Sequence, residues 1–330
     1  MKFGSVPVDK AEGAILAHSE AVVGKRLRKG VALTASHIAA LQQAGVSEVT
    51  VAQLEPRDVH EDQAALALAQ ALQDGAEGLR LSEPFTGRVN LIADGPGVVL
   101  LDVEKINAAN AVNPMVTVAT VGPFHQIHAG GMIATVKIIS YAVPEGEIAR
   151  AAELAKGAVG LAKPVKKTAS LIITEIPGGP GHKGLAAIEN RLSALEITLT
   201  ETRSCPHDEG ALADEIAAAK GDVVLILTGS ATSDPQDVAP AALRRAGGTV
   251  DRFGMPVDPG NLLFLGDIES RPVIGLPGSA RSPVLHGADW VLSRVACGIA
   301  VTSADIAGMG VGGLLKEIPT RPMPRRGRAR

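Results

Sequence analysis

Two carboxylates and a run of small, hydroxylated residues follow a short, wholly apolar stretch of the sequence. The apolar residues Val223–Leu227 predict a strand that is buried on both faces. The residues after it are Thr228, Gly229, Ser230, Ala231, Thr232, Ser233 and the two acids Asp234 and Asp237. Small side chains let a ligand approach the backbone, and the amides at the start of a helix, predicted here from Val238, favour an anion. The stretch predicts an anion or phosphate site beside carboxylates; the alternative is a loop that binds nothing.

Two further loops carry similar chemistry. Residues 175–184, EIPGGPGHKG, are rich in glycine and follow a predicted strand, although a plain surface loop explains them equally well. Residues 275–283, GLPGSARSP, follow another predicted strand. There Arg281 offers a bidentate guanidinium to phosphate, and Ser279 and Ser282 offer hydroxyl donors. We expect all three loops to meet, because the carboxyl ends of parallel strands lie at one edge of a sheet.

The elements that must position these loops alternate between strand and helix from residue 169 onward. Strands are predicted at 169–174, 197–202, 223–227, 249–257, 262–265 and 272–275, and helices at 184–194, 209–219, 240–246 and 285–296. This alternation predicts an α/β fold, a mostly parallel sheet with helices on both faces. We place a linker at 160–168, an α+β domain at 1–160, the α/β domain at 168–305 and a C-terminal extension at 306–330. The basic end of that extension is expected to be disordered.

The first half of the chain carries weaker signals. Thr34 is a plausible N-cap for a helix that Gly45 closes, and an alternating strand follows at 46–51. Asn107, Asn110 and Asn113 could offer amides to a ring, but capping and turn formation also explain them. His125 and His128 have no acid or thiol at a ligand spacing, so solvent-facing histidines are predicted. Lys137 within the strand pattern 132–142 predicts an exposed or edge position.

Composition narrows the function classes. The chain has 330 residues, a formal net charge of −3 and only 2% aromatic residues, so neither a basic field nor stacking surfaces favour nucleic acid. Neither a signal-peptide pattern nor a membrane-length apolar run is present. Cys205 and Cys297, the two cysteines, are too few for a metal set and fit a reducing compartment. We therefore expect a cytoplasmic protein that binds neither nucleic acid nor membrane.

At this point the motifs resemble a known family. TGSATSDPQDVAPAAL is similar to the TGGTG-x-x-x-RD-x-TPEA motif of the molybdopterin-binding fold, which adenylyltransferases and molybdotransferases of molybdenum cofactor synthesis share. GMPVDPGNL, residues 254–262, and GLPGS, residues 275–279, resemble two later loops of that fold. The resemblance implies a three-layer domain whose cofactor-binding residues are Thr228, Gly229, Ser230, Ala231, Thr232, Ser233, Pro259, Gly260, Asn261, Gly275, Pro277, Gly278, Ser279, Ala280, Arg281 and Ser282.

A narrower likeness concerns partners. SATSDPQDVAPAALRRAGG and DIAGMGVGGLLKEI, residues 305–318, resemble bacterial proteins in which this domain precedes a cofactor nucleotidyltransferase half. The chain looks like a stand-alone version, which implies a separate nucleotidyltransferase, or a molybdenum hydroxylase, as partner; a homo-oligomer is also open. The block KGVALTASHIAALQQAGVSEVTVAQL, residues 29–54, resembles a segment of molybdotransferases, where it immediately precedes the cofactor-binding domain.

The departures from the family pattern bear on activity. Ser230 and Ala231 replace glycines and narrow the space for a nucleotide phosphate, and Asp234 is an extra carboxylate. By resemblance, Asp234 and Asp237 are the candidate catalytic residues and could hold magnesium; Asp237 could equally be only a helix cap. We expect a protein that binds molybdopterin or the finished cofactor, with molybdate and Mg²⁺ as further candidates. The alternatives are an active molybdotransferase or adenylyltransferase, a non-catalytic scaffold for a separate cytidylyltransferase and, more distantly, a nucleotide-recycling hydrolase.

Overall fold

The computed structural model describes residues 1–315 of the chain and divides it into two compact units. The first consists of Met1–Gly95 and Val99–Leu161, and the second of Pro96–Val98 and the chain from Ala162 onward. The predicted disorder of the basic tail concerns residues 316–330, which lie outside the described residues.

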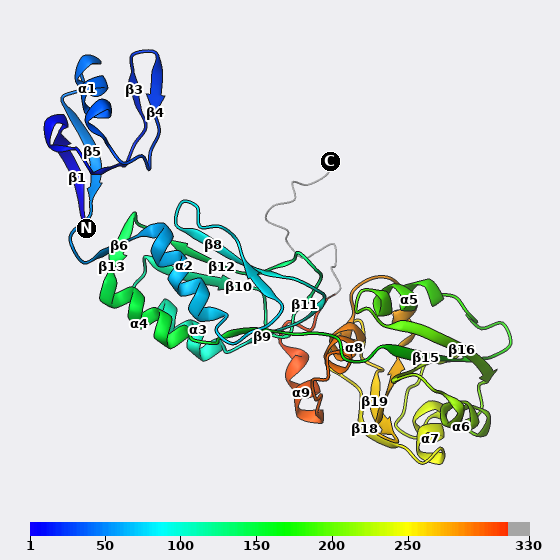
Figure 1. The fold of residues 1–330 in the computed structure, drawn as a ribbon. Coiled ribbons are helices and arrows are strands. Elements are labelled where there is room, and N and C mark those ends of the chain that lie inside the picture. Colours follow the sequence, from blue (N-terminus) through cyan, green and yellow to red (C-terminus); the bar gives the residue numbers. More distant parts are fainter. Residues whose placement is uncertain (316–330) are drawn as a thin grey trace. The chain divides into compact units, whose positions relative to one another are not determined.

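The first part of unit 1 is a small sheet with one helix (Figure 1). Its strands β1 (Lys2–Pro7), β5 (Glu48–Gln53) and β2 (Ile15–Leu16) pair in that order, and β3 (Glu20–Val22) pairs with β4 (Lys25–Leu27) as a hairpin. The predicted helix is α1 (Ala35–Gln43), and a 3-10 turn spans Val8–Lys10. The Thr34 hydroxyl accepts the amide of His37, and Gly45 after the helix has a φ of 76°, so both predicted helix boundaries are confirmed.

The larger part of unit 1 is a second α+β body. Its main sheet has the order β10 (Val116–Thr120), β12 (Met132–Ile138), β8 (Arg88–Ala93), β7 (Leu79–Leu81). Smaller sheets pair β11 (Gln126–Ile127), β9 (Gly97–Leu101) and β14 (Val159–Ala162), and β13 (Ala142–Pro144) with β6 (Asp58–His60). The helices α2 (Glu61–Leu72), α3 (Val103–Asn110) and α4 (Glu145–Ala155) share one apolar core with the main sheet.

The structure tests the predictions made for Lys137 and for the asparagines near residue 110. Lys137 does not lie on an edge strand: β12 runs between β10 and β8, and the Lys137 ammonium donates to the carbonyl of Thr86 and lies 3.8 Å from Glu61. The edge alternative was therefore wrong, whereas the Lys137 side chain keeps 30% of its surface exposed while its charge is paired. The amide of Asn110 donates to the carbonyl of Val118 and accepts its N–H, which supports the structural reading of the asparagines.

Unit 2 is built on a single six-stranded sheet. The strand order is β16 (Thr198–Pro206), β15 (Thr168–Glu175), β17 (Val223–Leu227), β20 (Arg271–Leu276), β19 (Phe264–Ile268), β18 (Thr249–Phe253). The first four strands are parallel, and β19 runs antiparallel to both of its neighbours. The predicted mostly parallel sheet is therefore confirmed.

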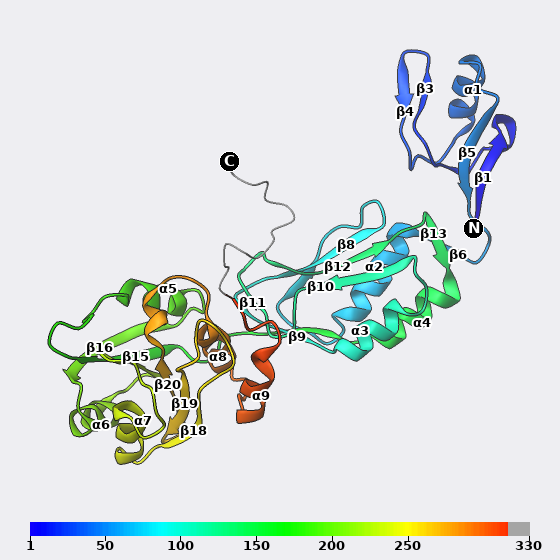
Figure 2. The same ribbon diagram turned by 180° about the vertical axis from the view of Figure 1, so that it is seen from behind.

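Helices cover both faces of this sheet and make three layers (Figures 1 and 2). One layer holds α5 (Leu185–Ser193) and α8 (Gly287–Ala296), and the other holds α6 (Glu209–Ala218) and α7 (Val238–Arg245). Along β17, Leu225 and Leu227 pack in the α5 and α8 core, while Val224 and Ile226 pack in the α6 and α7 core. Both faces are buried because successive side chains of a strand alternate.

The chain after α8 is also part of unit 2. The short helix α9 (Ser303–Ala307) and a 3-10 turn (Gly308–Gly310) place Ile306 and Met309 in the apolar core. Beyond them Asp258 donates to the carbonyl of Gly313 at 2.9 Å and forms a bridge with Leu314. The domain therefore continues through residues that the sequence assigned to an extension.

Candidate functional site

The loops singled out in the sequence begin at one edge of the sheet of unit 2. Glu175 pairs with Pro206 at the ends of β15 and β16, Ile173 pairs with Leu227, and Leu227 pairs with Leu276. The segments that follow these strands therefore start side by side. Their small residues, predicted to border a ligand, lie beyond the carboxyl ends of the strands, which is the side of the sheet where open α/β folds bind ligands.

Thr174, a fully buried residue of β15, joins three of these strand ends. Its hydroxyl accepts the amide of Gly229 at 2.9 Å and lies 2.8 Å from Nδ1 of His207, which follows β16. A Cβ at Gly229 would stand only 2.7 Å from the Thr174 carbonyl oxygen, so the loop after β17 can reach this hydroxyl only with glycine. This close packing gives Gly229 a structural reason that is independent of any ligand.

The loop after β17 separates buried from exposed hydroxyls. Thr228 and Thr232 are buried, and their hydroxyl oxygens lie 3.5 Å apart, whereas the side chains of Ser230, Ala231 and Ser233 are exposed. The consecutive amides of Ser230, Ala231 and Thr232 donate to no acceptor among the described residues. The loop thus presents a run of free N–H groups at its exposed turn, which is the chemistry of an anion site.

Asp237 closes this loop and begins α7. One carboxylate oxygen accepts the amide of Ser233 at 2.9 Å, and the other accepts the amide of Val238 at 2.7 Å. Burial works to raise the pKa of Asp237, but these amide hydrogen bonds and the nearby His207 outweigh it, and the pKa is lowered. Asp237 is therefore a helix cap and a loop staple, whatever it does to a ligand. Asp234 is exposed and accepts the amide of Gln236 at 2.7 Å within its own turn.

Asp234 and Asp237, the predicted magnesium ligands, are engaged with the backbone of their own loop. Three of their four oxygens already accept backbone amides. In the part of the chain that the structure describes, no group of three or more His, Cys, Asp or Glu side chains is arranged to hold a metal ion, and this includes His125 and His128.

Arg281 ties the three predicted loops together. It lies in a 3-10 turn (Gly278–Arg281) after β20, and Nη1 donates to the carbonyls of Gly181 and Lys183 at 2.8 and 2.7 Å. Nη2 donates to the carbonyl of Thr228 at 3.0 Å. Burial lowers the pKa of the guanidinium. Three of its five N–H donors are thus used within the chain, and the predicted contact with phosphate is left to Nε and one hydrogen of Nη2.

The turn after β20, like the loop after β17, contains both buried and exposed residues. Pro277 and Ala280 are buried, and Gly275 is in contact with Phe264, whose ring would lie 1.9 Å from a Cβ at that position. Gly278 and Ser279 are exposed, and their amides have no acceptor among the described residues. A second pair of N–H groups without an acceptor therefore follows β20, the strand next to β17.

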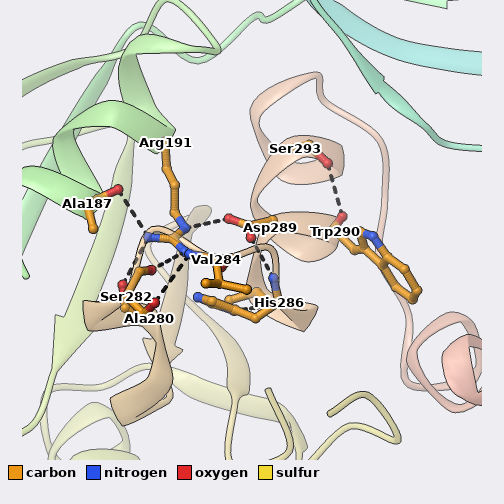
Figure 3. Close-up of polar contacts among 10 residues, drawn as sticks. Ala187, Arg191, Ala280, Ser282, Val284, His286, Asp289, Trp290 and Ser293 are labelled. Atoms are coloured by element: carbon orange, nitrogen blue, oxygen red, sulfur yellow. Dashed lines mark hydrogen bonds and ion pairs between the residues drawn. The ribbon is translucent and has the colours of Figure 1, made fainter. Parts of the chain in front are cut away.

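A second arginine shapes the segment that leads from this turn into α8 (Figure 3). Arg191 of α5 donates from Nε to Asp289 at 2.5 Å and from Nη1 to the carbonyls of Ala187 and Ala280. Its Nη2 donates to the carbonyls of Ser282 and Val284 at 2.7 and 3.0 Å. Every polar hydrogen of this guanidinium is engaged, so Arg191 fixes the chain around Ser282 and has no donor left for a ligand.

The remaining predicted residues lie in the loop before β19. Pro259 accepts the amide of Gly287, and a Cβ at Gly260 would stand 2.8 Å from the same amide nitrogen. The side-chain amide of Asn261 donates to the carbonyl of Met255 at 3.2 Å. Pro259 and Gly260 thus pack against the start of α8, which follows the segment after β20.

Sequence reasoning missed Thr174, His207 and Arg191. The strand that it ended at residue 202 continues to Pro206, and only that longer strand places His207 at the edge of the sheet. Both cysteines are buried, and burial raises the pKa of each thiol to about 11, which agrees with inert thiols. No helix among the described residues is long and apolar enough to cross a bilayer.

Two family models match parts of the chain. Residues 183–295 match a family model described as a probable molybdopterin binding domain, and residues 5–53 match a domain of unknown function (DUF8806). No curated protein matches the chain. Unit 2 therefore contains a domain of the molybdopterin-binding family, as the motifs predicted; the likeness to fusion proteins stays a prediction.

Two solved structures from archaea are similar to the chain. One is a molybdopterin biosynthesis moea protein from Pyrococcus horikosii, at 16% identity over 90% of this chain and 75% of that one, with a TM-score of 0.32. The other is a molybdenum cofactor biosynthesis protein from Pyrococcus furiosus, at 12% identity over 93% and 65%, with a TM-score of 0.24. Because both TM-scores are low, the assignment of unit 2 to the molybdopterin-binding family rests on the family-model match over residues 183–295.

Proposed function

We propose that unit 2 binds molybdopterin or the finished molybdenum cofactor, and that the protein takes part in the synthesis or delivery of that cofactor. The observation that carries the proposal is the pair of free amide runs, Ser230–Thr232 and Gly278–Ser279, at the ends of two neighbouring strands. Backbone N–H groups at strand ends suit a phosphate. Molybdopterin carries a terminal phosphate, and the exposed hydroxyls of Ser230, Ser233 and Ser279 add donors beside it.

Binding is favoured over group transfer by the state of the two acids. Each carboxylate oxygen of Asp237 accepts one backbone amide, and one oxygen of Asp234 accepts an amide within its own turn. The side chain of Ser230 stands where the family motif has its second glycine. A carrier needs only the donors, whereas an adenylyl or molybdenum transferase needs a second site for nucleotide or molybdate.

The test separates these functions. The purified chain is titrated with molybdopterin, with and without molybdate, and the mixtures are assayed for adenylylated or metallated product in the presence of ATP and Mg²⁺. Saturable binding without product supports a carrier, and product supports the transferase alternative. A failure to bind molybdopterin overturns the proposal.

A matched pair of variants locates the site. Ser230→Asp places a negative charge beside the free amides, so it should weaken molybdopterin binding at least tenfold, since a like charge repels the phosphate. Ser303→Asp adds the same charge on the first residue of α9, beside Arg252, and should leave binding unchanged. Equal affinity in both variants would place the ligand elsewhere.

The proposal also includes partner proteins that would receive the cofactor. A separate cofactor nucleotidyltransferase or a molybdenum hydroxylase would receive the ligand from a carrier of this kind, and cofactor transfer from the loaded chain to either protein is the measurement that tests it. Self-association is tested by sedimentation of the chain with and without molybdopterin.

A further inference from the structure

His207 stands at the same edge of the sheet and has no part in the site that the sequence predicts. It is half-buried at the end of β16, where its backbone amide donates to the carbonyl of Glu175 at 3.0 Å. Its ring nitrogen Nδ1 lies 2.8 Å from the Thr174 hydroxyl. The backbone bond and the ring bond hold the imidazole in one orientation beside the loop after β17.

The buried hydroxyl of Thr174 determines which ring nitrogen carries the proton. That hydroxyl already accepts the amide of Gly229, and its own hydrogen needs an acceptor because Thr174 is fully buried. Nδ1 of His207 is the acceptor within reach. In the neutral ring Nδ1 is therefore unprotonated, and Nε2 carries the hydrogen.

Nε2 is the free end of this chain of hydrogen bonds. It has no acceptor among the described residues. The ring shares the Thr174 hydroxyl with the amide of Gly229, the residue directly before Ser230, so one hydroxyl joins it to the start of the loop that presents the amides of Ser230, Ala231 and Thr232. A donor held through Thr174 and Glu175 thus lies at the strand ends from which the loop of Ser230 begins.

We propose that Nε2–H of His207 donates to an anionic oxygen of the ligand in this crevice, which makes His207 a ligand-binding residue. The inference rests on the proposed function for the identity of the ligand. The shared chemistry is a phosphate oxygen, supplied by molybdopterin or by free phosphate. Thr174 is then a positioning residue that orients the donor.

Two isosteric variants separate a contact from a structural role. Asn at position 207 keeps an acceptor near the place of Nδ1, so the bond from Thr174 can remain, but it lacks a donor at Nε2. Gln places its amide nitrogen near Nε2. His207→Asn should weaken molybdopterin binding about tenfold, the size of a hydrogen bond to a charged group, and His207→Gln should recover most of it.

The decisive experiment measures three quantities on the full chain: the melting temperature, the affinity for molybdopterin, and the ¹⁵N shifts of the His207 ring in the free protein and during titration with inorganic phosphate. We expect unchanged melting for His207→Asn and a lower melting temperature for His207→Gln, because Gln leaves the buried Thr174 hydroxyl without its acceptor. We also expect tenfold weaker binding only for His207→Asn, a protonated Nε2 and a shift of that nucleus on addition of phosphate. If the wild type binds molybdopterin and His207→Asn binds equally well, the inference fails and the proposed function stands. If the wild type does not bind molybdopterin, the proposed function fails; the donor role of His207 then stands if phosphate shifts Nε2, and falls if it does not.

Discussion

The guanidinium of Arg281 donates to the carbonyl oxygen of Thr228 at 3.0 Å, across the ends of two neighbouring parallel strands. The same group holds the carbonyls of Gly181 and Lys183, so one side chain fixes three loops. The sequence predicted that Arg281 binds phosphate, but most of its donors instead hold the three loops together. The amides and hydroxyls around it are the groups left to meet a ligand.

Replacing Arg281 with Lys should destabilise unit 2 by about 2–4 kcal/mol, because an ammonium cannot make the three directed bonds of the fork. Urea unfolding measures the loss. Arg245→Lys is the control, since Arg245 is exposed and makes one ion pair at 3.6 Å; it should change stability by less than about 0.5 kcal/mol. Equal effects in the two variants would refute the tie.

Gly229→Ala should cost about 1–3 kcal/mol, because a Cβ there meets the Thr174 carbonyl oxygen at 2.7 Å and the loop must move. The matched change Gly278→Ala has no atom within 4 Å of the new Cβ and should be nearly neutral. Chemical denaturation of both variants makes the comparison. A stable Gly229→Ala protein would show that the loop is not held against β15.

Asp237→Ala should destabilise the protein by about 1–2 kcal/mol through loss of the helix cap, and Asp234→Ala by less than about 0.5 kcal/mol, since its one bond lies inside an exposed turn. The pKa of Asp237 is lowered in the fold, so its contribution is present above the unfolded pKa and is lost as pH falls through the folded value. Unfolding at pH 7 and at pH 3 tests both statements. An equal difference between wild type and Asp237→Ala at the two pH values would contradict the second.

His286 predicts a pH dependence of stability. It is fully buried and caps α8, where Nδ1 accepts the amide of Ala288 at 3.0 Å. Burial, opposed by Asp289 and aided by Arg191, lowers its pKa from 6.5 to about 4. The unfolded chain then binds more protons between these values, so stability should fall by up to about 3 kcal/mol as pH drops from 6.5 to 4.

His286→Asn keeps a capping oxygen without a titrating ring, so it should flatten this part of the stability curve. The exposed His125→Asn is the control and should leave the curve unchanged. Denaturant melts at intervals across this pH range supply the measurement. A wild-type curve no steeper than that of His286→Asn would contradict the assignment.

The sequence predicted the sheet of unit 2 because its strands are short apolar runs with clear helix boundaries between them. It also placed the loop of Ser230 and the turn of Ser279 at one edge, since strand direction alone decides that. It could not assign Arg281, because carbonyl acceptors 53 to 100 positions away leave no trace in spacing. His207 was not predicted as a site residue, because the last residues of β16 lack an apolar run and the end of the strand could not be located from the sequence. Lys137 was misjudged because its partners, Glu61 and Thr86, lie far from it in the chain.

The most direct test of the central claim compares molybdopterin with the same pterin after removal of its terminal phosphate, by calorimetric titration of the full chain. Binding to the free amides at the ends of β17 and β20 predicts saturable binding of molybdopterin, a loss of at least tenfold without the phosphate, and the same loss in Ser230→Asp. Equal affinity for the two pterins would contradict the phosphate site, and no binding of either would contradict the function proposed for it.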